Sequence, residues 1–316
     1  MATPVRFIAR ADVERLLDLD RLIEGLAGAF AKLSQGAASV PPRIAAMTPE
    51  GLLAAMPGYL PGAGLETKLV SVFPGNHERG LPSHQALIAL FDEETGIPRA
   101  VLDGTAITAI RTGAASALAT RLLARPDARV LAILGAGVQG RSHLAAVRRV
   151  REFSQVRVAS RRPEHARALA EEAGITACDD FASACRGADV VCCCTDAGAP
   201  VVELEWLAPG AHVTSVGASR QGPELSPEVV SAADALAVES RAAFLPYPAG
   251  AHELQGLNPE RGLELGELVL QTRPGRSRPD QLTVYKSMGH AVEDLVAARL
   301  VLDAADAAGA GTLVDM

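Results

Sequence analysis

Short, fully apolar runs alternate with helical patterns through the middle of this 316-residue chain. An apolar run of this kind is typical of a strand that is buried on both faces, and strands that alternate with helices predict a parallel α/β sheet with right-handed crossovers. The predicted strands are Val130–Leu134, Gln155–Ser160, Val190–Thr195, His212–Val216 and Ala235–Val238, and the predicted helices run to about Val150 and over Pro163–Ala173.

The two ends of the chain have a different pattern. The opening third combines helical spacing over Ala11–Leu33 with strands and loops, and a long helix over Thr105–Ala124 ends at Arg125-Pro126-Asp127. The last helical pattern, Ser287–Ala308, has no strand predicted after it. We therefore predict a Rossmann-type, doubly wound domain over 125–286 and a smaller α+β domain over 1–124, onto which 287–316 packs back. The predicted strands of the smaller domain are Leu65–Phe73, His84–Phe91 and Pro98–Asp103, with further strands within Val40–Pro61.

Composition and charge narrow the class of protein. The chain is 48% hydrophobic and 21% charged, and its formal net charge of −7 argues against binding to nucleic acid through phosphates. No uncharged stretch reaches the roughly 18 residues of a membrane span, and the N-terminus lacks the apolar core of a secretory signal. The five cysteines lie within 178–194 without the spacing of a metal site, which predicts reduced cysteines, no metal and a cytoplasmic location.

A glycine fingerprint follows the strand Val130–Leu134. Gly135, Gly137 and Gly140 form G-x-G-x-x-G between that strand and the next helix. In such a loop the first glycine permits a tight turn, the second lets the backbone approach a pyrophosphate, and the third lets helix and strand pack closely. The free N–H groups of the helix start also attract phosphates. The fingerprint predicts that this domain binds a dinucleotide.

The residues at the end of the next predicted strand, Gln155–Ser160, indicate which dinucleotide binds. A site for NAD(H) typically has an acidic residue there, which accepts a hydrogen bond from the ribose 2′-hydroxyl. No acidic residue is present at 158–163. Instead the chain carries Ser160, Arg161 and Arg162, and the forked donors of arginine suit a 2′-phosphate. We predict NADP(H) as the cofactor; if both arginines are merely solvated loop residues, the protein would use NAD(H) as well as NADP(H).

Three cations stand in the otherwise apolar surroundings of the first domain. They are Arg43 in VPPRIAAM, Lys68 in LETKLVSVF and Arg111 in TAITAIRTGAA. Burying an unpaired cation is costly, so one bound carboxylate would be a natural shared partner. Taken singly, each cation also fits a surface or salt-bridged position.

Several segments together resemble the ornithine cyclodeaminase/mu-crystallin family. They are TKLVSVF, LPSHQALIALFD, AVLDGTAITAIRTGAASALAT, VLAILGAGVQG, GAHVTSVGASR and TVYKSMGHAVEDLVAARL, in that order over nearly the whole chain. The resemblance implies a homodimer whose first domain, completed by the C-terminal helix, binds substrate and forms the interface. It also implies that the Rossmann domain holds a nicotinamide cofactor and that the site lies between the two domains.

The resemblance also implies roles for single residues. Arg43, Lys68 and Arg111 would hold a substrate carboxylate, and Lys68 would supply a proton near the reacting nitrogen. Met56 and Met288 would contact the substrate. The residues that would contact the cofactor are Ser83, Arg111, Thr112, Gly135, Gly137, Val138, Gln139, Gly140, Ser160, Arg161, Arg162, Thr195, Val216 and Ser287.

Two departures from the cyclodeaminase pattern point away from ornithine. Ser219 stands in GASR where cyclodeaminases carry Asp, and Ala54 stands where they carry Glu, so both carboxylates for a cationic side chain are missing. The resemblance then favours the ketimine reductase branch, with a proton relayed by Lys68 or by a solvent molecule near Ser219. The predicted reaction is hydride transfer between NADP(H) and the α-carbon of a small α-imino or α-amino acid, such as pyrroline-2-carboxylate.

Two alternative functions are compatible with the sequence, and several carboxylates and histidines have no predicted catalytic or binding role. The alternatives are ornithine cyclodeaminase, which releases ammonia without net change in the cofactor, and a crystallin-like protein that binds nucleotide without turnover. Asp294 is interpreted as a solvated or helix-start carboxylate. No role is predicted for Glu224, Glu239 or Glu253, and His212 and His290 are interpreted as structural.

Overall fold

The computed structural model describes residues 4–217 and 222–315. Its contacts divide the chain into two compact units, one of residues 1–111 with 290–316 and one of residues 112–289. The division falls inside the long helix α3 (Gly104–Leu123), whereas the sequence pattern placed it at the end of that helix. Each unit is described by itself below.

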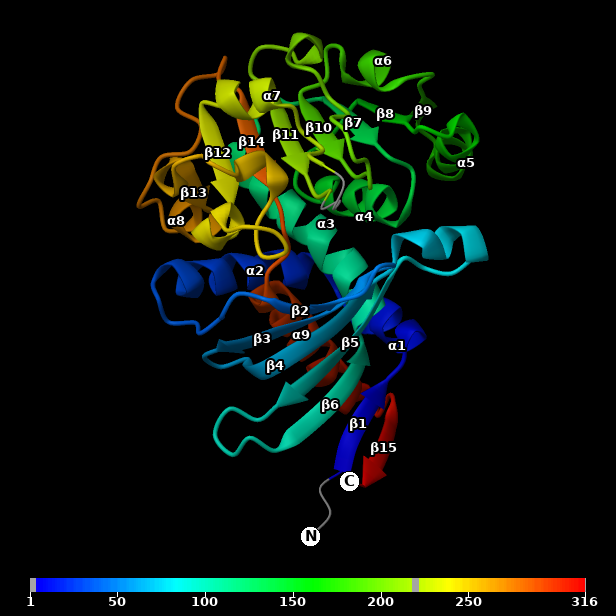
Figure 1. Ribbon diagram of the computed structural model, residues 1–316, viewed down its shortest axis with the longest axis vertical. Helices are drawn as coiled ribbons and strands as arrows, with labels where there is room; N and C mark the ends of the chain where they lie inside the picture. The colour runs from blue at the N-terminus through cyan, green and yellow to red at the C-terminus, as the bar shows by residue number, and fades with distance from the viewer. Residues whose placement is uncertain (1–3, 218–221, 316) are drawn as a thin grey trace. The chain divides into compact units, whose positions relative to one another are not determined.

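The first unit, as far as it is described, is built on a seven-stranded mixed sheet of order β15-β1-β6-β5-β4-β3-β2 (Figure 1). Strands β1 and β6 are parallel, and the other neighbours are antiparallel. The elements are β1 (Pro4–Ile8), α1 (Arg10–Leu16), α2 (Leu19–Ser34), β2 (Ile44–Met47), β3 (Leu52–Leu60), β4 (Gly64–Val72), a 3-10 helix (Pro74–Arg79), β5 (His84–Phe91), β6 (Pro98–Asp103), the start of α3, α9 (Ala291–Ala308) and β15 (Thr312–Asp315).

Alternation along the strands gives this sheet two different faces. In β3 and β4 successive residues alternate between buried and more exposed, as expected for strands with one face on the core. Helix α9 packs against β3, β4 and β5 and also contacts α2 and α1. Most of α9 is buried, including its acidic residues Glu293 and Asp294. The inner face of the sheet therefore meets a helix that carries two buried carboxylates.

The described part of the second unit contains an eight-stranded, fully parallel sheet of order β13-β12-β14-β11-β10-β7-β8-β9. The chain runs outward from β7 to β9 and then restarts at β10 on the other side of β7, so the topological switch lies between β7 and β10. The strands are β7 (Val130–Leu134), β8 (Gln155–Ala159), β9 (Thr176–Ala177), β10 (Val190–Cys193), β11 (His212–Ser215), β12 (Ala235–Val238), β13 (Gly262–Glu264) and β14 (Thr283–Lys286).

The helices of the second unit connect these strands in the Rossmann manner. They are α4 (Val138–Val147), α5 (Pro163–Ala173), α6 (Phe181–Cys185), α7 (Pro227–Ala232) and α8 (Leu265–Val269), with short 3-10 helices at Leu204–Trp206, Arg241–Phe244, His252–Leu254 and Pro259–Arg261. This architecture confirms the predicted fold class, a doubly wound parallel sheet with a second, mixed domain. No helix among the described residues is long and apolar enough to cross a membrane.

Several elements differ from the sequence prediction. Ala11–Leu33 is two helices, because the chain leaves the helical conformation at Leu17 and Asp18, whose side chain caps α2 by accepting from the Arg21 N–H. The helix predicted over Ser287–Ala308 begins only at Ala291. The prediction that no strand follows it is wrong, because β15 pairs antiparallel with β1. Four exposed residues at a sheet edge are too short to show a period of two.

Strand β14 lies between β11 and β12, in the middle of the parallel sheet, yet the hydrophobic pattern did not predict it. Its sequence is Thr-Val-Tyr-Lys, and all four residues are buried. The polar side chains interrupt the apolar run that predicted the other central strands. Their burial depends on partners from distant segments, such as Ser215 and Glu253, which bind Lys286.

Candidate functional site

The glycine loop of the second unit has the geometry that the fingerprint predicts. Gly135 has φ +106°, and a side chain there would meet the Cys194 carbonyl oxygen at 2.5 Å. At Gly140 a side chain would collide with the Gly135 carbonyl and lie 3.3 Å from Ile133. Gly137, by contrast, has nothing within 4 Å of the added carbon. Two glycines are therefore required by packing, whereas Gly137 borders open space where a ligand can approach.

The helix that follows this loop presents an uncapped N-terminus. Gly137 is the N-cap of α4 and makes no side-chain capping hydrogen bond. The first N–H groups of a helix have no partner within the helix and carry the positive end of its dipole. Val138 is exposed and Gln139 is half-buried, whereas Gly140 is buried. The arrangement at the switch between β7 and β10 suits the pyrophosphate of a dinucleotide.

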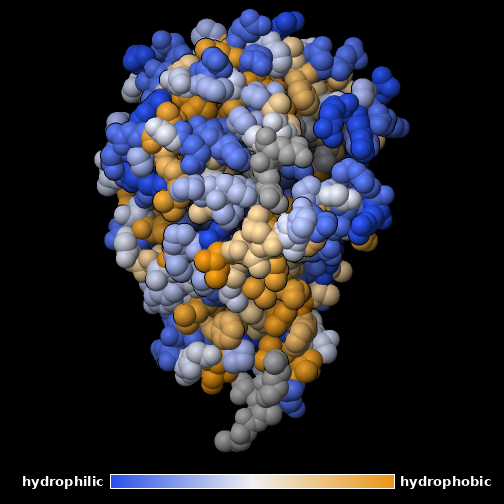
Figure 2. Space-filling view, viewed as in Figure 1, coloured by the Kyte–Doolittle hydropathy of each residue, from blue (hydrophilic) through white to orange (hydrophobic). Residues whose placement is uncertain are grey.

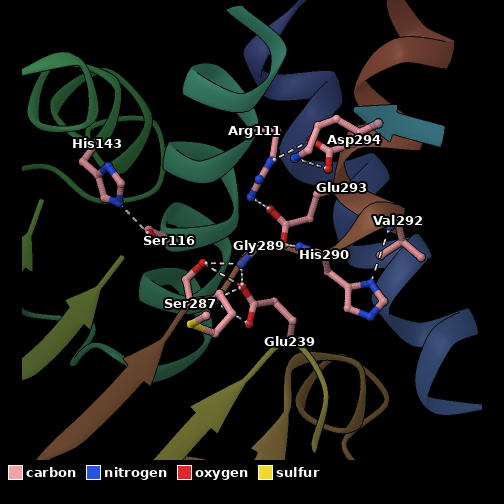
Figure 3. Close-up of polar contacts among 12 residues, drawn as sticks. Arg111, Ser116, His143, Glu239, Ser287, Gly289, His290, Val292, Glu293 and Asp294 are labelled. Carbon is pink, nitrogen blue, oxygen red and sulfur yellow. Dashed lines mark hydrogen bonds and ion pairs between the residues drawn. The ribbon is translucent and has the colours of Figure 1, made fainter. Parts of the chain in front are cut away.

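Helix α4 is held onto α3 by a buried histidine. His143 bonds the Gln139 carbonyl through Nδ1 at 2.7 Å and the Ser116 hydroxyl through Nε2 at 2.8 Å, and the latter bond is visible in Figure 3. A carbonyl only accepts, so Nδ1 carries the proton and Nε2 accepts from Ser116. Burial lowers the pKa of His143 to about 4, and the ring stays neutral as it fixes the first turn of α4.

The residues predicted to select the ribose substituent follow β8. Ser160 is half-buried and accepts a hydrogen bond from the Arg162 N–H at 3.3 Å. Arg161 and Arg162 are exposed. Neither guanidinium forms an ion pair with any residue that the structure describes. Their donors are thus available to solvent or to a phosphate.

A buried glutamate joins the loops at the carboxyl ends of β10 and β11. Glu224 is 1% exposed and accepts four hydrogen bonds of 2.6–2.8 Å, from the Thr195 N–H and hydroxyl, the Ser215 hydroxyl and the Gly217 N–H. Thr195, a predicted cofactor contact, is therefore held with its hydroxyl proton on Glu224. Val216, another predicted contact, is half-buried between Ser215 and Gly217.

A second layer of the same network includes a buried lysine. Lys286 donates to Ser215 at 3.0 Å, to the Gly217 carbonyl at 2.5 Å and to Glu253 at 3.0 Å. Glu253 in turn accepts from the Glu224 N–H at 2.7 Å. The ends of β10, β11 and β14 are thereby connected through side chains.

Glu239, like Glu224, fixes a loop by accepting several hydrogen bonds, here from the segment that follows β14. It accepts from the Ser287 hydroxyl at 2.6 Å, the Met288 N–H at 2.9 Å and the Gly289 N–H at 2.8 Å (Figure 3). Ser287 is buried and Met288 is half-buried. Glu224, Glu239 and Glu253 were assigned no role from sequence, yet they position three predicted ligand contacts. The only signal was that Glu239 directly follows a predicted strand.

In the first unit, two of the predicted cations meet at one carboxylate. Asp294 accepts from Lys68 at 2.7 Å and from the Arg111 Nε–H at 3.0 Å, while Arg111 also donates to Glu293 at 2.7 Å. Figure 3 shows the Arg111 side chain from α3 pointing toward both acids at the start of α9. The side chains of these two cations and two acids are at most 5% exposed. Both cations therefore have internal partners, in line with the salt-bridged alternative.

Burial and pairing act in opposite directions on these groups. Burial lowers the pKa of Lys68, and Arg111 nearby lowers it further, against the attraction of Asp294. Burial opposes the charge of Asp294, but Arg111 and Lys68 hold the pKa of its carboxyl below the ordinary value. The pair therefore remains ionised, while Lys68 releases a proton more readily than an exposed lysine does.

The interpretation of Asp294 as a solvated carboxylate is wrong. Asp294 is indeed in the first turn of α9, but it is fully buried. A pattern within one helix cannot show that the helix start faces Lys68 and Arg111, which lie some 200 residues earlier. The motif HAVED contains both acids, but nothing in it marks them as buried.

The remaining predicted residues lie as follows. Met56 is 4% exposed and pairs with Lys68 across β3 and β4. Arg43 is half-buried and immediately precedes β2, whose first residue pairs with Ala55, the neighbour of Met56. Ser83 is half-buried just before β5, and Thr112 is buried in α3. Ser219 lies outside the described residues. No group of three metal-ligating side chains occurs within residues 4–217 and 222–315.

The sequence model of the ornithine cyclodeaminase/mu-crystallin family matches residues 5–309. The chain belongs to this family. Ketimine reductase mu-crystallin of Mus musculus is 42% identical over 257 residues, which cover 80% of each chain. The structure of Thermococcus litoralis Δ1-pyrroline-2-carboxylate reductase with NADH and L-proline matches at a TM-score of 0.92 and 34% identity, covering 98% of this chain and 100% of that one.

An archaeal alanine dehydrogenase dimer with bound NAD matches at a TM-score of 0.90 and 29% identity, over 99% of this chain and 100% of that chain. The family identified from the motifs is therefore confirmed, and so is the two-domain fold. These relatives include proteins named for imine reduction and for amino-acid oxidation.

Proposed function

We propose that this protein reduces a small cyclic α-imino acid, with pyrroline-2-carboxylate as the favoured substrate. The broader class follows from the family: the chain is an NAD(P)-dependent oxidoreductase that acts on C=N or CH–NH bonds. In this proposal the first unit binds the substrate and the second binds the nucleotide. The observation that carries the proposal is the buried contact of Lys68 and Arg111 with Asp294.

The proposed role of Lys68 is to protonate the imine nitrogen. An ammonium has three donors, and Lys68 uses one of them, on Asp294, among the described residues. Its remaining N–H groups can bind the substrate carboxylate or the imine nitrogen. The lowered pKa favours release of the proton, and Asp294 keeps the ammonium in place. Arg111, fixed by Glu293 and Asp294, and Arg43 would complete the binding of the carboxylate.

The second unit has the residues to hold a nicotinamide dinucleotide. Gly137 borders open space at the start of α4, and Thr195 is fixed by Glu224 at the neighbouring strand end. The bound dinucleotide would supply the hydride. The protein would supply orientation, through the α4 N-terminus for the pyrophosphate and through Thr195, Val216 and Ser287 for the nicotinamide.

The exposed Arg161 and Arg162 support NADP(H) over NAD(H) as the cofactor. Exchanging both for alanine should raise the KM for NADPH by about tenfold or more and leave the KM for NADH nearly unchanged, because a charge-assisted bond to phosphate contributes roughly 1.5–3 kcal/mol. Equal effects on both cofactors would contradict the preference.

The reaction itself is tested by mixing the protein with NADPH or NADH and pyrroline-2-carboxylate and following the loss of reduced nicotinamide. Steady consumption with formation of proline is the expected result. If no imine is reduced while ornithine yields ammonia with NAD in catalytic amounts, the protein is a cyclodeaminase. If neither reaction occurs but nucleotide binds, the crystallin-like alternative holds.

We also propose a homodimer formed through the outer face of the first sheet. A row of paired residues crosses four strands there, and Ile44, Leu69 and Leu87 in it are 71%, 42% and 56% exposed. Figure 2 shows hydrophobic residues gathered over these strands. Light scattering should give twice the mass of the chain, and Leu69→Glu should lower it to that of a monomer. A cytoplasmic location stays a prediction, supported by the free cysteines.

A further inference from the structure

A third carboxyl, that of Glu66, lies near the buried cluster of Lys68, Arg111, Glu293 and Asp294 and is not used by the reaction described above. Glu66 is on β4, two residues before Lys68, and therefore on the same inner face of the sheet. It pairs with Gly58 on β3 and is 3% exposed. Neither of its carboxyl oxygens forms a hydrogen bond with any described residue. A buried carboxyl without partners is rare and calls for an explanation.

The charges that face Glu66 come from three elements. Lys68 lies on its own strand, Asp294 on α9 and Arg111 on α3, where Arg111 also holds Glu293. Strand β3 has no charged residue, and the buried residues of β5 are Ala86, Ile88 and Leu90. Burial and the nearby Asp294 raise the pKa of Glu66 well above its ordinary value, more than Lys68 and Arg111 lower it. Burial and Asp294 thus favour the protonated, neutral form of Glu66.

The charge balance of the cluster depends on that proton. Lys68 and Arg111 contribute two positive charges, and Asp294 and Glu293 contribute two negative charges. With a neutral Glu66 the cluster is uncharged as a whole, and with an ionised Glu66 it carries one negative charge. In a buried site of low dielectric this extra charge repels a second anion strongly. An ionised Glu66 would also compete for the donors of Lys68.

We propose that Glu66 must be a neutral acid for an anionic substrate to bind at Lys68 and Arg111, so that its ionisation sets the alkaline limit of substrate binding. The inference rests on the proposed function, since it takes the substrate to be a carboxylate. It makes Glu66 a residue that governs affinity and leaves the chemical step to Lys68.

The test compares Glu66→Gln with the matched exchange Glu94→Gln, which lies in an exposed turn. Glutamine has the size of a protonated glutamate but cannot ionise. In wild type and E94Q, the KM for the imine should rise about tenfold per pH unit once Glu66 ionises. In E66Q the part of this rise that is due to Glu66 should vanish, with kcat little changed. Titration of the imine itself is common to all three proteins. An unchanged alkaline rise in E66Q, or a loss of kcat at constant KM, would overturn the inference.

Two measurements keep this test separate from catalysis. Calorimetry with pyrrole-2-carboxylate, a planar carboxylate that is not reduced, should show affinity falling with pH in wild type and not in E66Q. If that holds while no imine is reduced, only the proposed function fails. If wild type and E66Q bind with the same pH dependence, the inference fails whatever the activity. If the carboxylate does not bind at any pH, both fail.

The pH dependence of the melting temperature tests independently whether Glu66 is protonated in the folded protein. Folded Glu66 keeps its proton above the pKa of an unfolded glutamate, so the folded state binds more protons and loses stability as pH rises between the two values. The melting temperature of wild type should therefore fall relative to E66Q over that range, and E94Q should follow wild type. Parallel curves for wild type and E66Q would show that Glu66 is already ionised, and would end the inference.

Discussion

The two units each contain a cluster of buried charges, and the clusters differ in how completely their polar groups are paired. In the second unit, Glu224 accepts four hydrogen bonds, and Lys286 donates three to atoms of the protein. In the first unit, Lys68 donates one hydrogen bond and Glu66 forms none with described residues. A saturated network stabilises loops, whereas an unsaturated one retains capacity for a ligand. The paired network of the second unit therefore has a structural role, whereas the cluster of the first unit is the candidate for substrate binding and proton transfer.

Replacing each of the two buried lysines in turn should separate the roles of the two clusters most clearly. Lys68→Met should lower kcat/KM by about 10³-fold, within the range for loss of a proton donor. Nucleotide affinity, measured by fluorescence titration, should stay near that of wild type. Lys286→Met should instead lower the free energy of unfolding by about 3–5 kcal/mol, because Glu253 is left as a buried, unpaired charge.

Urea unfolding and steady-state kinetics on both lysine variants check this prediction, with circular dichroism to confirm that each is folded. Full activity in the Lys68 variant would remove that residue from the mechanism. A Lys286 variant of normal stability would show that its network is not a scaffold.

Glu224→Gln tests the paired network of the second unit. Glutamine keeps one acceptor oxygen and presents an NH2 group to donors that need an acceptor, so two of the four hydrogen bonds are lost. The free energy of unfolding should fall by about 3 kcal/mol. Either Thr195 or the segment of residues 215–217 then loses its hydrogen bonds, so the KM for the nucleotide should rise while the KM for the imine changes less. A variant with altered imine KM alone would contradict the positioning role.

Gly137→Ala should have the smallest effect and the most specific one. The position has φ −84° and open space around an added carbon, so folding should be unaffected. A bound pyrophosphate would meet the methyl group, and nucleotide affinity should fall by about tenfold, or about 1.4 kcal/mol. Gly140→Ala is the control, since its side chain would collide with the Gly135 carbonyl and lower stability itself. Unchanged nucleotide affinity in Gly137→Ala would mean that the pyrophosphate lies elsewhere.

Local patterns accounted for much of the fold and for part of the site. The apolar runs of β7, β10, β11 and β12 were recognisable because strands of a parallel sheet are buried on both faces. Strands β1, β9, β13, β14 and β15 were missed. Strand β14 was missed for its buried polar residues and β15 for its short, exposed edge position. Among site residues, Lys68 and Arg111 stood out as cations in apolar segments, but their carboxylate partners did not stand out at all.

Sequence alone determined the family, the parallel sheet and the glycine loop, because each depends on short segments whose residues act on their immediate neighbours. The three-dimensional packing, in contrast, brings Asp294 and Glu293 to the two cations and Glu224 and Glu239 to the loops. It also leaves Glu66 near Lys68 without a hydrogen bond to any described residue. Burial and pairing of charges depend on segments far apart in the chain, and a one-dimensional pattern contains no distance between them.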